Sequence, residues 1–265
     1  MLEPFLKWAG GKRWLVNRHL NTFPASYNCY IEPFLGSGAM FFSLEPNEAI
    51  LSDLNCELIA AYSAIKDNWR GIASLLGKYQ KRHSKTFYYD MRDSTPTSPS
   101  ARAARLIYLN RTCWNGLYRV NLRGEFNVPK GTKENVVLET DDFRSVSLAL
   151  EHASLVNSDF EPIIQRAQKG DLIFADPPYV TSHSNNGFLK YNEKLFSWDD
   201  QLRLRDCLFQ AMKNGAHVLL TNADTPPIRK LYDEGFTIRG VSRSSVIASD
   251  PSRRGAANEL IITSW

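Results

Sequence analysis

The sequence predicts an α/β protein built on a mainly parallel sheet, with a helical subdomain inserted into it. Short apolar runs recur along the chain, and segments with helical spacing separate several of them. Strands that alternate with helices are typical of a parallel sheet, because parallel neighbours need a crossover connection. Residues 56–143 break this rhythm, since helical patterns there lead into a polar, turn-rich stretch.

The predicted strands are short apolar runs bounded by turn or polar residues. Their apolar character is continuous, as in Leu172-Ile173-Phe174-Ala175, which indicates burial on both faces of the sheet. In chain order the runs are Cys29 to Pro33, Ala49 to Asp53, Ser154 to Ser158, Asp171 to Ala175, His217 to Thr221, Phe236 to Ser242 and Asn258 to Ser264.

Helical spacing marks three segments between these runs. The third segment has the clearest ends, since Ser197 and Asp200 have the spacing of a capping box and Gly215 is a typical stop signal. The apolar positions of the three segments are Leu58, Ile59, Tyr62 and Ile65; Ile72, Leu75, Leu76 and Tyr79; and Leu204, Leu208, Ala211 and Met212.

The predicted insert extends over residues 56–143. Its helical patterns are followed by a polar, turn-rich run from Thr112 to Asn135, and the segment from Thr95 to Ser100 is typical of a surface loop. We therefore predict a main domain formed by residues 1–55 and 144–265, and a subdomain formed by residues 56–143.

The composition is that of a globular protein with a sizeable core. The chain has 265 residues, of which 43% are hydrophobic and 23% charged, and this excludes a globally disordered or collagen-like chain. No zinc-ligand spacing, membrane span or secretory signal is evident, so we expect a cytoplasmic protein without a metal. The cysteines are far apart in sequence and are expected to be reduced thiols: Cys29, Cys56, Cys113 and Cys207.

Positive charge is concentrated in one part of the chain. The net charge is +4, but residues 101–133 alone carry +6. A local basic patch on a near-neutral protein indicates a polyanionic partner such as nucleic acid, although an ordinary solvated surface gives the same count. The basic residues are Arg102, Arg105, Arg111, Arg119, Arg123, Lys130 and Lys133.

Asp176-Pro177-Pro178-Tyr179 directly follows a predicted buried strand. Ligands of open α/β sheets bind beyond the carboxyl ends of strands. The two prolines fix the backbone and remove two N–H donors, so the loop offers a carboxylate, carbonyl oxygens and an aromatic ring. That set suits a planar exocyclic amine whose ring stacks on Tyr179. The alternative is a rigid connecting loop.

The segment Glu32 to Gly38 follows the first predicted strand and opens a helix. Its Gly36-x-Gly38 pattern allows close approach of the backbone to a ligand, although tight strand–helix turns use the same pattern. Asp53 ends the next predicted strand, where an acid can bind ribose hydroxyls. Together these features indicate an adenosine-containing cofactor.

Two further segments are rich in basic, aromatic and glycine residues. Phe5 to Lys12 fits contacts with an anion and an adenine, or an ordered N-terminal arm. In the segment Leu109 to Pro129, Arg and Asn suit base edges in the major groove and an aromatic side chain can wedge between bases. The alternative for the second segment is a basic hairpin that is simply solvated.

These segments, in their order and spacing, resemble the motifs of the Dam-type family of DNA adenine-N6 methyltransferases. A weaker likeness continues to the C-terminus. The matching motifs are FLKWAGGK (residues 5–12), EPFLGSG (32–38), ILSDLN (50–55), LNRTCWNGLYRVNLRGEFNVP (109–129) and DPPY (176–179).

The resemblance implies a Rossmann-like methyltransferase sheet of about seven mainly parallel strands, with residues 56–143 as a target-recognition subdomain. It also implies S-adenosylmethionine as the cofactor. Positions matching the family's cofactor contacts are Trp8, Lys12, Asp53, Asp159 and Asp176, with Phe34, Gly36 and Gly38 in the glycine-rich loop. The catalytic motif is Asp176, Pro177, Pro178 and Tyr179.

The substrate implied by the resemblance is an adenine in duplex DNA, and the family's usual site is GATC. The mechanism implied is flipping of the adenine and direct methyl transfer, without a covalent enzyme intermediate. Matching positions are Lys7, Leu117 and Arg119 for reading the site, Trp114 and Asn115 for intercalation and the strand left behind, and Arg111 and Asn121 for the DNA backbone.

The chain departs from the family after Val128-Pro129. The usual continuation is an aromatic residue, a glycine and then a basic and often aromatic pair, whereas this chain has Lys130-Gly131-Thr132-Lys133. A lysine ammonium is a flexible point charge that is poorly suited to reading bases. We therefore predict that Lys130 and Lys133 bind phosphates that flank the site.

Two other functions share part of this pattern. A methyltransferase that acts on a protein amide or a small molecule also uses a DPPY-like loop, but it would not need the basic insert. A DNA-binding module without catalysis would not need an intact Asp176 and glycine loop. No obligate protein partner is indicated by the sequence.

Overall fold

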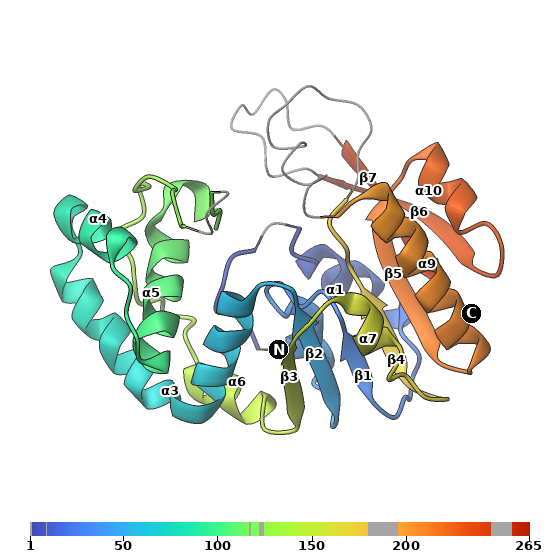
Figure 1. Ribbon diagram of the computed structural model, residues 1–265, viewed down its shortest axis with the longest axis horizontal. Coiled ribbons are helices and arrows are strands. Elements are labelled where there is room, and N and C mark those ends of the chain that lie inside the picture. Colours follow the sequence, from blue (N-terminus) through green and yellow to red (C-terminus); the bar gives the residue numbers. More distant parts are fainter. Residues whose placement is uncertain (1, 9, 117, 122–124, 180–195, 245–255) are drawn as a thin grey trace. The chain divides into compact units, whose positions relative to one another are not determined.

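Short strands with buried apolar side chains form one seven-stranded sheet in the part of the chain that the structure describes (Figure 1). The structure is a computed structural model and describes residues 2–8, 10–116, 118–121, 125–179, 196–244 and 256–265. The strand order is β3-β2-β1-β4-β5-β7-β6. The strands are β1 (Tyr30–Glu32), β2 (Ala49–Asp53), β3 (Ala153–Asn157), β4 (Leu172–Ala175), β5 (His217–Ala223), β6 (Thr237–Ser244) and β7 (Ala256–Thr263).

The pairing within the sheet confirms the predicted fold class. Strand β1 is parallel to both β2 and β4, and β4 is parallel to β5. Strand β7 is the exception, because it runs antiparallel to both β5 and β6. Each strand falls on one of the predicted apolar runs, with ends that differ by a few residues. The carboxyl ends of β1, β4 and β5 therefore lie at the same edge of the sheet, where ligands of such folds bind.

The chain divides into two compact units. The first comprises residues 1–16, 35–47 and 53–157, and the second comprises residues 17–34, 48–52 and 158–265. Helix α1 (Arg13–His19) runs from the first into the second. The helices of the first unit are α2 (Ala39–Leu44), α3 (Cys56–Arg82), α4 (Lys85–Asp93), α5 (Pro99–Thr112), η2 (Trp114–Gly116) and α6 (Phe143–Ala149), and those of the second are η1 (Leu20–Thr22), α7 (Phe160–Ile164), α9 (Trp198–Lys213) and α10 (Pro226–Leu231).

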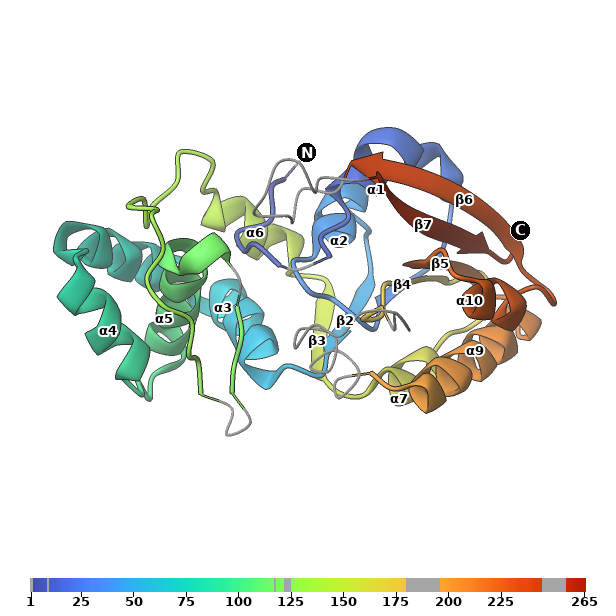
Figure 2. The same cartoon turned by 90° about the horizontal axis from the view of Figure 1, so that it is seen from above.

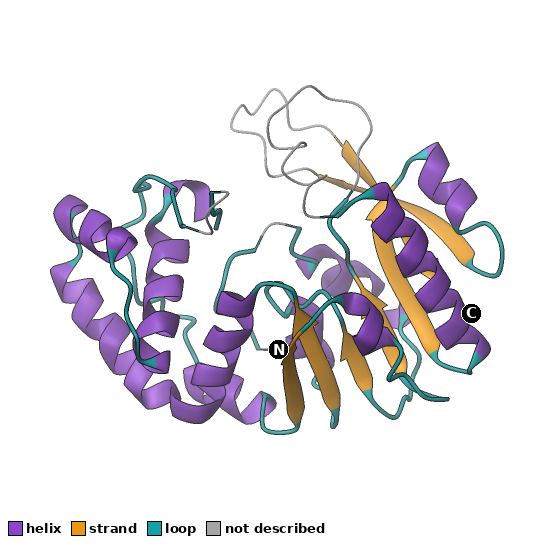
Figure 3. Cartoon of the chain, in the orientation of Figure 1, coloured by secondary structure: helices purple, strands orange, loops and turns teal. Residues whose placement is uncertain are grey.

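Residues 56–112 of the first unit are mainly helical (Figure 3). Helix α3 begins at the N-cap Asn55, whose side chain accepts from two backbone N–H groups, and bends at Asn68, which has non-helical backbone angles. Its apolar stripe packs against α5 and α6. Helix α5 begins after Ser98 with Pro99 in its first turn, a favourable start because proline lacks the N–H that would be left unpaired there. The predicted subdomain, residues 56–143, lies wholly within this unit.

In the second unit, α7 and α9 lie side by side, and α9 also contacts β5 (Figure 2). The predicted capping box is present, because the Ser197 side chain accepts from the Asp200 N–H and the Asp200 carboxylate accepts from the Ser197 N–H. Gly215 has a φ of 91°, a left-handed conformation that glycine adopts without strain. The chain therefore turns sharply from α9 into β5, as predicted.

The cysteines Cys29, Cys56, Cys113 and Cys207 are free, as expected. None of the helices in the described ranges combines the length and apolar character needed to span a membrane.

Candidate functional site

The glycine loop between β1 and α2 is held by Asp53 at the end of β2. The Gly36 N–H donates to Asp53 Oδ2 at 3.0 Å, and the Asn55 N–H donates to Asp53 Oδ1 at 2.9 Å. Burial raises the pKa of the Asp53 carboxyl, whereas these two hydrogen bonds favour its ionised form. Asp53 therefore fixes the loop by its own hydrogen bonds, which the sequence pattern did not predict.

Close packing explains both glycines of this loop. Gly36 and Gly38 have φ values of 50° and 66°. A Cβ on Gly36 would lie 3.0 Å from Trp8 Cδ1, and a Cβ on Gly38 would lie 3.0 Å from the Tyr62 hydroxyl. Trp8 also packs against Tyr118, whose ring stacks on the indole with ring centroids 5.5 Å apart. Trp8, the glycine loop and Asp53, predicted separately, thus lie together in the first unit.

Lys12 lies in the N-terminal segment and is only 3% exposed. Its Nζ donates to the Gly10 carbonyl oxygen at 2.8 Å. The ammonium group is therefore folded back on its own segment, in which the Gly11 N–H also donates to the Trp8 carbonyl oxygen. This conformation places a positive charge inside the FLKWAGGK motif.

In the second unit, the side chains of Asp176 and Tyr179 each bond to a neighbouring strand. The Thr221 hydroxyl on β5 donates to Asp176 Oδ1 at 2.8 Å. The Tyr179 hydroxyl donates to Glu259 Oε2 on β7 at 2.8 Å. Burial raises the pKa of Tyr179 well above its ordinary value, and the Asp176 and Glu259 carboxylates raise it further, so its hydroxyl stays protonated. Pro177, which lies between Asp176 and Tyr179 in the sequence, is buried.

Asp159 is held by an arginine that sequence reasoning missed. Asp159 is the N-cap of α7, where it accepts from the Glu161 N–H, and its two oxygens accept from Arg203 at 2.9 and 3.1 Å. The Arg203 guanidinium lies 4.4 Å from the Phe160 ring centroid, and that ring packs against Phe34. Phe34 and Asp159, both predicted to contact the cofactor, therefore belong to one cluster in the second unit.

The turn after α5 carries several residues predicted to bind DNA. Trp114 is 54% exposed, and Asn115 has a φ of 58°, a left-handed conformation that asparagine tolerates better than most residues. Arg119 is exposed, and its Nε donates to Asn127 Oδ1 at 3.3 Å. An antiparallel bridge between Val120 and Phe126 gives this segment a hairpin-like form. Leu117 lies outside the described residues.

Two asparagine side chains form hydrogen bonds in and around this segment. The Asn110 side chain accepts from the Lys7 N–H at 2.9 Å and donates to the Lys7 carbonyl oxygen at 2.7 Å, so it fixes the backbone of Lys7 while the lysine side chain remains exposed. The Asn121 side chain bonds with the Glu125 carboxylate at 2.9 Å. The Asn110 side chain also donates to the Gly116 carbonyl oxygen at 3.4 Å, so it joins Lys7 to the turn after α5 within the first unit, although Lys7 and Asn110 are 103 residues apart in sequence.

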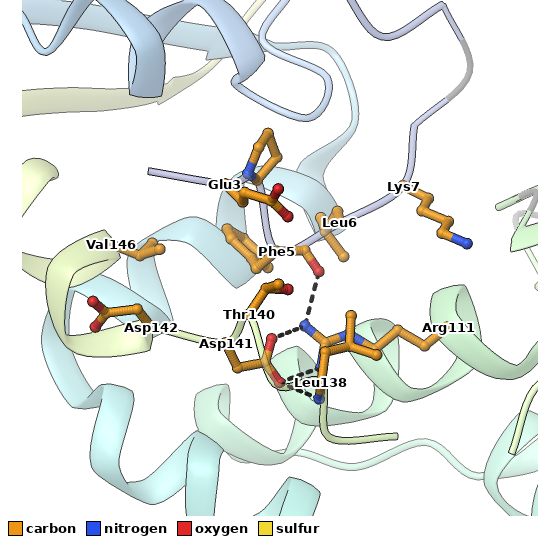
Figure 4. A pocket seen from close by; sticks show the side chains of 11 residues that line it. Glu3, Phe5, Leu6, Lys7, Arg111, Leu138, Thr140, Asp141, Asp142 and Val146 are labelled. Atoms are coloured by element: carbon orange, nitrogen blue, oxygen red, sulfur yellow. Dashed lines mark hydrogen bonds and ion pairs between the residues drawn. The ribbon is translucent and has the colours of Figure 1, made fainter. Parts of the chain in front are cut away.

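Arg111 was predicted to contact the DNA backbone, but it is buried in the first unit (Figure 4). It is 5% exposed, and its guanidinium forms two hydrogen bonds with the Asp141 carboxylate at 2.6 and 2.7 Å. The same group donates to the carbonyl oxygens of Val136 and Phe5. These bonds occupy both terminal nitrogens of the guanidinium, so we do not carry Arg111 into the proposed DNA interface.

The two lysines of the divergent segment differ from each other. Lys130 Nζ lies 2.7 Å from Glu134 Oε1, and its side chain is 16% exposed. Lys133 is exposed. The Glu134 carboxylate also lies 3.1 Å from His83 Nε2, and the lysine and histidine beside it lower the pKa of this carboxyl. Lys133 is therefore better placed than Lys130 to meet a phosphate.

Comparison with known proteins gives one consistent family. A family profile described as D12 class N6 adenine-specific DNA methyltransferase matches residues 8–247. The chain is 38% identical to a Type II methyltransferase, M1.LlaDCHI, of Lactococcus lactis subsp. cremoris, over all of this chain and 96% of that protein. It is 33% identical to the Type II methyltransferase M.MjaIII of Methanocaldococcus jannaschii, over 100% of this chain and 99% of that protein. It is also 33% identical to the DNA adenine methylase of Serratia marcescens, over 97% of this chain and 96% of that protein.

Proposed function

Because the chain belongs to the D12 class of N6 adenine-specific DNA methyltransferases, we propose that it methylates a flipped-out adenine within GATC in duplex DNA and that S-adenosylmethionine donates the methyl group. The observation that carries the proposal is the Asp176 loop, in which a carboxylate, a proline carbonyl and a fixed aromatic ring follow β4. The rival functions, a methyltransferase for other amines and a DNA-binding module without catalysis, do not fit the family as well.

The donor set of the first unit fits an adenosyl cofactor. Asp53 is a carboxylate at a strand end, and its oxygens have lone pairs beyond those used by the two backbone N–H groups, so they can accept from ribose hydroxyls. Trp8 offers an aromatic face beside the left-handed Gly36. Lys12 and Gly38 of this unit are assigned to the cofactor as well. Phe34 and Asp159, which belong to the second unit, stay predicted cofactor contacts. When bound, S-adenosylmethionine supplies an electrophilic methyl group on a sulfonium.

The chemistry of the second unit follows from the target amine. The N6 of adenine is conjugated into the purine ring and is a poor nucleophile. The Asp176 carboxylate and the Pro177 carbonyl can accept its two N–H bonds, which directs the nitrogen lone pair toward the methyl group. Tyr179 stacks on the flipped base, and Pro178 keeps the loop rigid. Positioning and electrostatics then supply most of the acceleration.

The segment from Trp114 to Lys133, together with Lys7, supplies the proposed DNA contacts. Trp114 is an exposed aromatic that can occupy the gap left by the flipped base, and the neighbouring Asn115 can bond to the orphaned partner base. Lys7 and Arg119 are assigned to base edges, together with Leu117. Asn121, Lys130 and Lys133 are assigned to the DNA backbone.

Incubation with radiolabelled S-adenosylmethionine and short duplexes tests the whole proposal. We expect label in a duplex that contains GATC, and none when the adenine of that site is replaced or the site is scrambled at equal length and composition. Label in a glutamine-containing peptide but not in DNA would contradict the proposal, and equal labelling of both duplexes would contradict the site.

Asp53→Ala should weaken cofactor binding strongly. The change removes the proposed ribose contacts and also the acceptor that holds Gly36, and hydrogen bonds to a charged group contribute about 1.5–3 kcal/mol. We expect the Kd from calorimetry to rise by roughly 10- to 100-fold. Asp53→Asn keeps one acceptor oxygen, so its cofactor Kd should fall between those of the unchanged protein and Asp53→Ala. DNA affinity without cofactor should not change, and an unaltered cofactor Kd would contradict the assignment.

Arg119→Ala and Lys133→Ala form a matched pair, because both remove an exposed positive charge from the same segment. A bidentate arginine–guanine contact gives about 1–3 kcal/mol of discrimination, so Arg119→Ala should relax site preference. Lys133→Ala should leave preference unchanged and reduce the slope of log affinity against log salt by about 0.9. Salt titrations on GATC and scrambled duplexes measure both effects. Uniform loss of affinity in Arg119→Ala would make that residue a phosphate contact.

A further inference from the structure

We propose that Thr221 and Glu259 are positioning residues for methyl transfer, in which the Thr221 hydroxyl orients the Asp176 carboxylate and the Glu259 carboxylate orients the Tyr179 ring. The inference rests on the proposed function, because it takes Asp176 and Tyr179 as the side chains that touch the adenine. Both contacts lie within the second unit, and neither Thr221 nor Glu259 belongs to a motif of the sequence analysis.

The sheet itself places Thr221 next to Asp176. Ala175 on β4 is in register with Leu220 on β5, so the next residue along each parallel strand is Asp176 on one side and Thr221 on the other. Thr221 is fully buried, and its Oγ1 lies 2.8 Å from Asp176 Oδ1. The hydroxyl donates to this carboxylate and also interacts with the Tyr179 hydroxyl, so it contacts both functional side chains of the loop. One oxygen of the Asp176 carboxylate is therefore bonded to a buried residue of β5, which restrains the orientation of the group.

Glu259 is a buried carboxylate in β7, directly before three apolar core residues. It is 2% exposed, and the following Leu260, Ile261 and Ile262 are buried. A buried carboxylate is costly and adds little to stability compared with an apolar side chain of the same size. Its Oε2 accepts from the Tyr179 hydroxyl at 2.8 Å. Because this hydroxyl lies at the far end of the ring and on its long axis, the bond fixes the direction in which the ring points and the place where a base would stack.

The two bonds have the same consequence for the loop. Both functional side chains are held before a substrate arrives, so less reorganisation is needed when the methyl group is transferred. Loss of either bond should therefore slow the chemical step and leave binding of the cofactor and of DNA nearly unchanged. A purely structural role predicts the reverse, a lower unfolding midpoint with an unaltered transfer rate in the folded fraction.

Single-turnover methylation of a GATC duplex, with enzyme and cofactor saturating, tests Thr221. Thr221→Val keeps the shape and removes the hydroxyl, and we expect transfer to slow by about 10- to 100-fold, the range seen when a hydrogen-bond partner that orients a metal ligand is lost. Thr221→Ser keeps the hydroxyl and should stay within about threefold of the unchanged protein. Wild-type transfer in Thr221→Val, or equal slowing in both variants, would overturn the inference.

A double-mutant cycle tests Glu259. If Glu259 acts through the Tyr179 hydroxyl, then Glu259→Leu and Tyr179→Phe should slow transfer by similar factors, and the double variant should be no slower than either single variant. Additive losses would overturn this half of the inference. Glu259→Gln retains an acceptor and should be the mildest of the three. All rates are measured below each variant's own unfolding midpoint.

Asp176→Ala is assayed in the same series to separate the proposed catalytic role of Asp176 from the positioning role of Thr221. An active Asp176→Ala would remove the proposed catalytic role itself. An inactive Asp176→Ala beside a fully active Thr221→Val would leave the proposed function intact and reject only the positioning role.

Discussion

Asp176→Ala should slow methyl transfer by about 100- to 1000-fold, the range seen when one preorganised polar contact to a reacting group is removed. Asp176 follows β4 and is held by Thr221, so its carboxylate is fixed where the proposed mechanism needs an acceptor for the N6 amine. Alanine removes that acceptor and keeps the two prolines that shape the loop. The measurement is the single-turnover rate with a GATC duplex.

The control for this change is Asp199→Ala, which removes an exposed carboxylate from the first turn of α9 in the same unit. It should methylate at the wild-type rate. DNA affinity should be nearly the same for both variants, because Asp176 is proposed to touch the flipped base and not the DNA backbone. A turnover above about half of the wild-type value in Asp176→Ala would contradict its assignment.

The sheet could be predicted from the sequence because burial on both faces requires a continuous run of apolar residues in each strand. Continuous apolar runs such as Leu172 to Ala175 have no other common explanation when turn residues bound them. The antiparallel direction of β7 could not be predicted in this way, because an apolar run has the same composition in either direction. The glycine loop and Asp53 could be predicted for a related reason, since their positions relative to strand ends are local in sequence.

The pairing of side chains from distant segments could not be predicted. Thr221 and Glu259 are ordinary residues of apolar runs, and only the strand register brings Thr221 next to Asp176. Arg203 is one of several charges on an amphipathic helix, and its bonds to Asp159 depend on how α9 packs against α7. Asn110 belongs to a recognised motif, but its bonds to the Lys7 backbone depend on a contact over 103 residues.

The charge count of residues 101–133 was misleading for a physical reason. Composition treats each basic residue as a free surface charge, whereas the structure pairs several of them with acids outside that window. These pairs are Arg102 with Glu57, Arg111 with Asp141 and Lys130 with Glu134. In the described part of the segment, Arg119 and Lys133 are exposed and not paired with an acid, so the positive surface available to DNA is narrower than the sequence indicated.

Arg111→Met should lower the free energy of unfolding by about 3–5 kcal/mol, because it leaves the Asp141 carboxylate buried without its partner. The change also removes the donors to the Phe5 and Val136 carbonyl oxygens, so the N-terminal segment loses an anchor to α5. The midpoint of urea unfolding measures the effect. Arg119→Met is the matched control, since it changes an exposed arginine and should alter stability by less than about 0.5 kcal/mol.

The same pair of variants decides between an internal and a DNA-binding role for Arg111. If the buried ion pair is its role, Arg111→Met should bind DNA with an unchanged salt slope when measured below its unfolding midpoint. The double variant Arg111→Met, Asp141→Leu should recover part of the lost stability, because an apolar pair replaces the unpaired carboxylate. Full stability in Arg111→Met together with a salt slope reduced by about 0.9 would identify Arg111 as a phosphate contact after all.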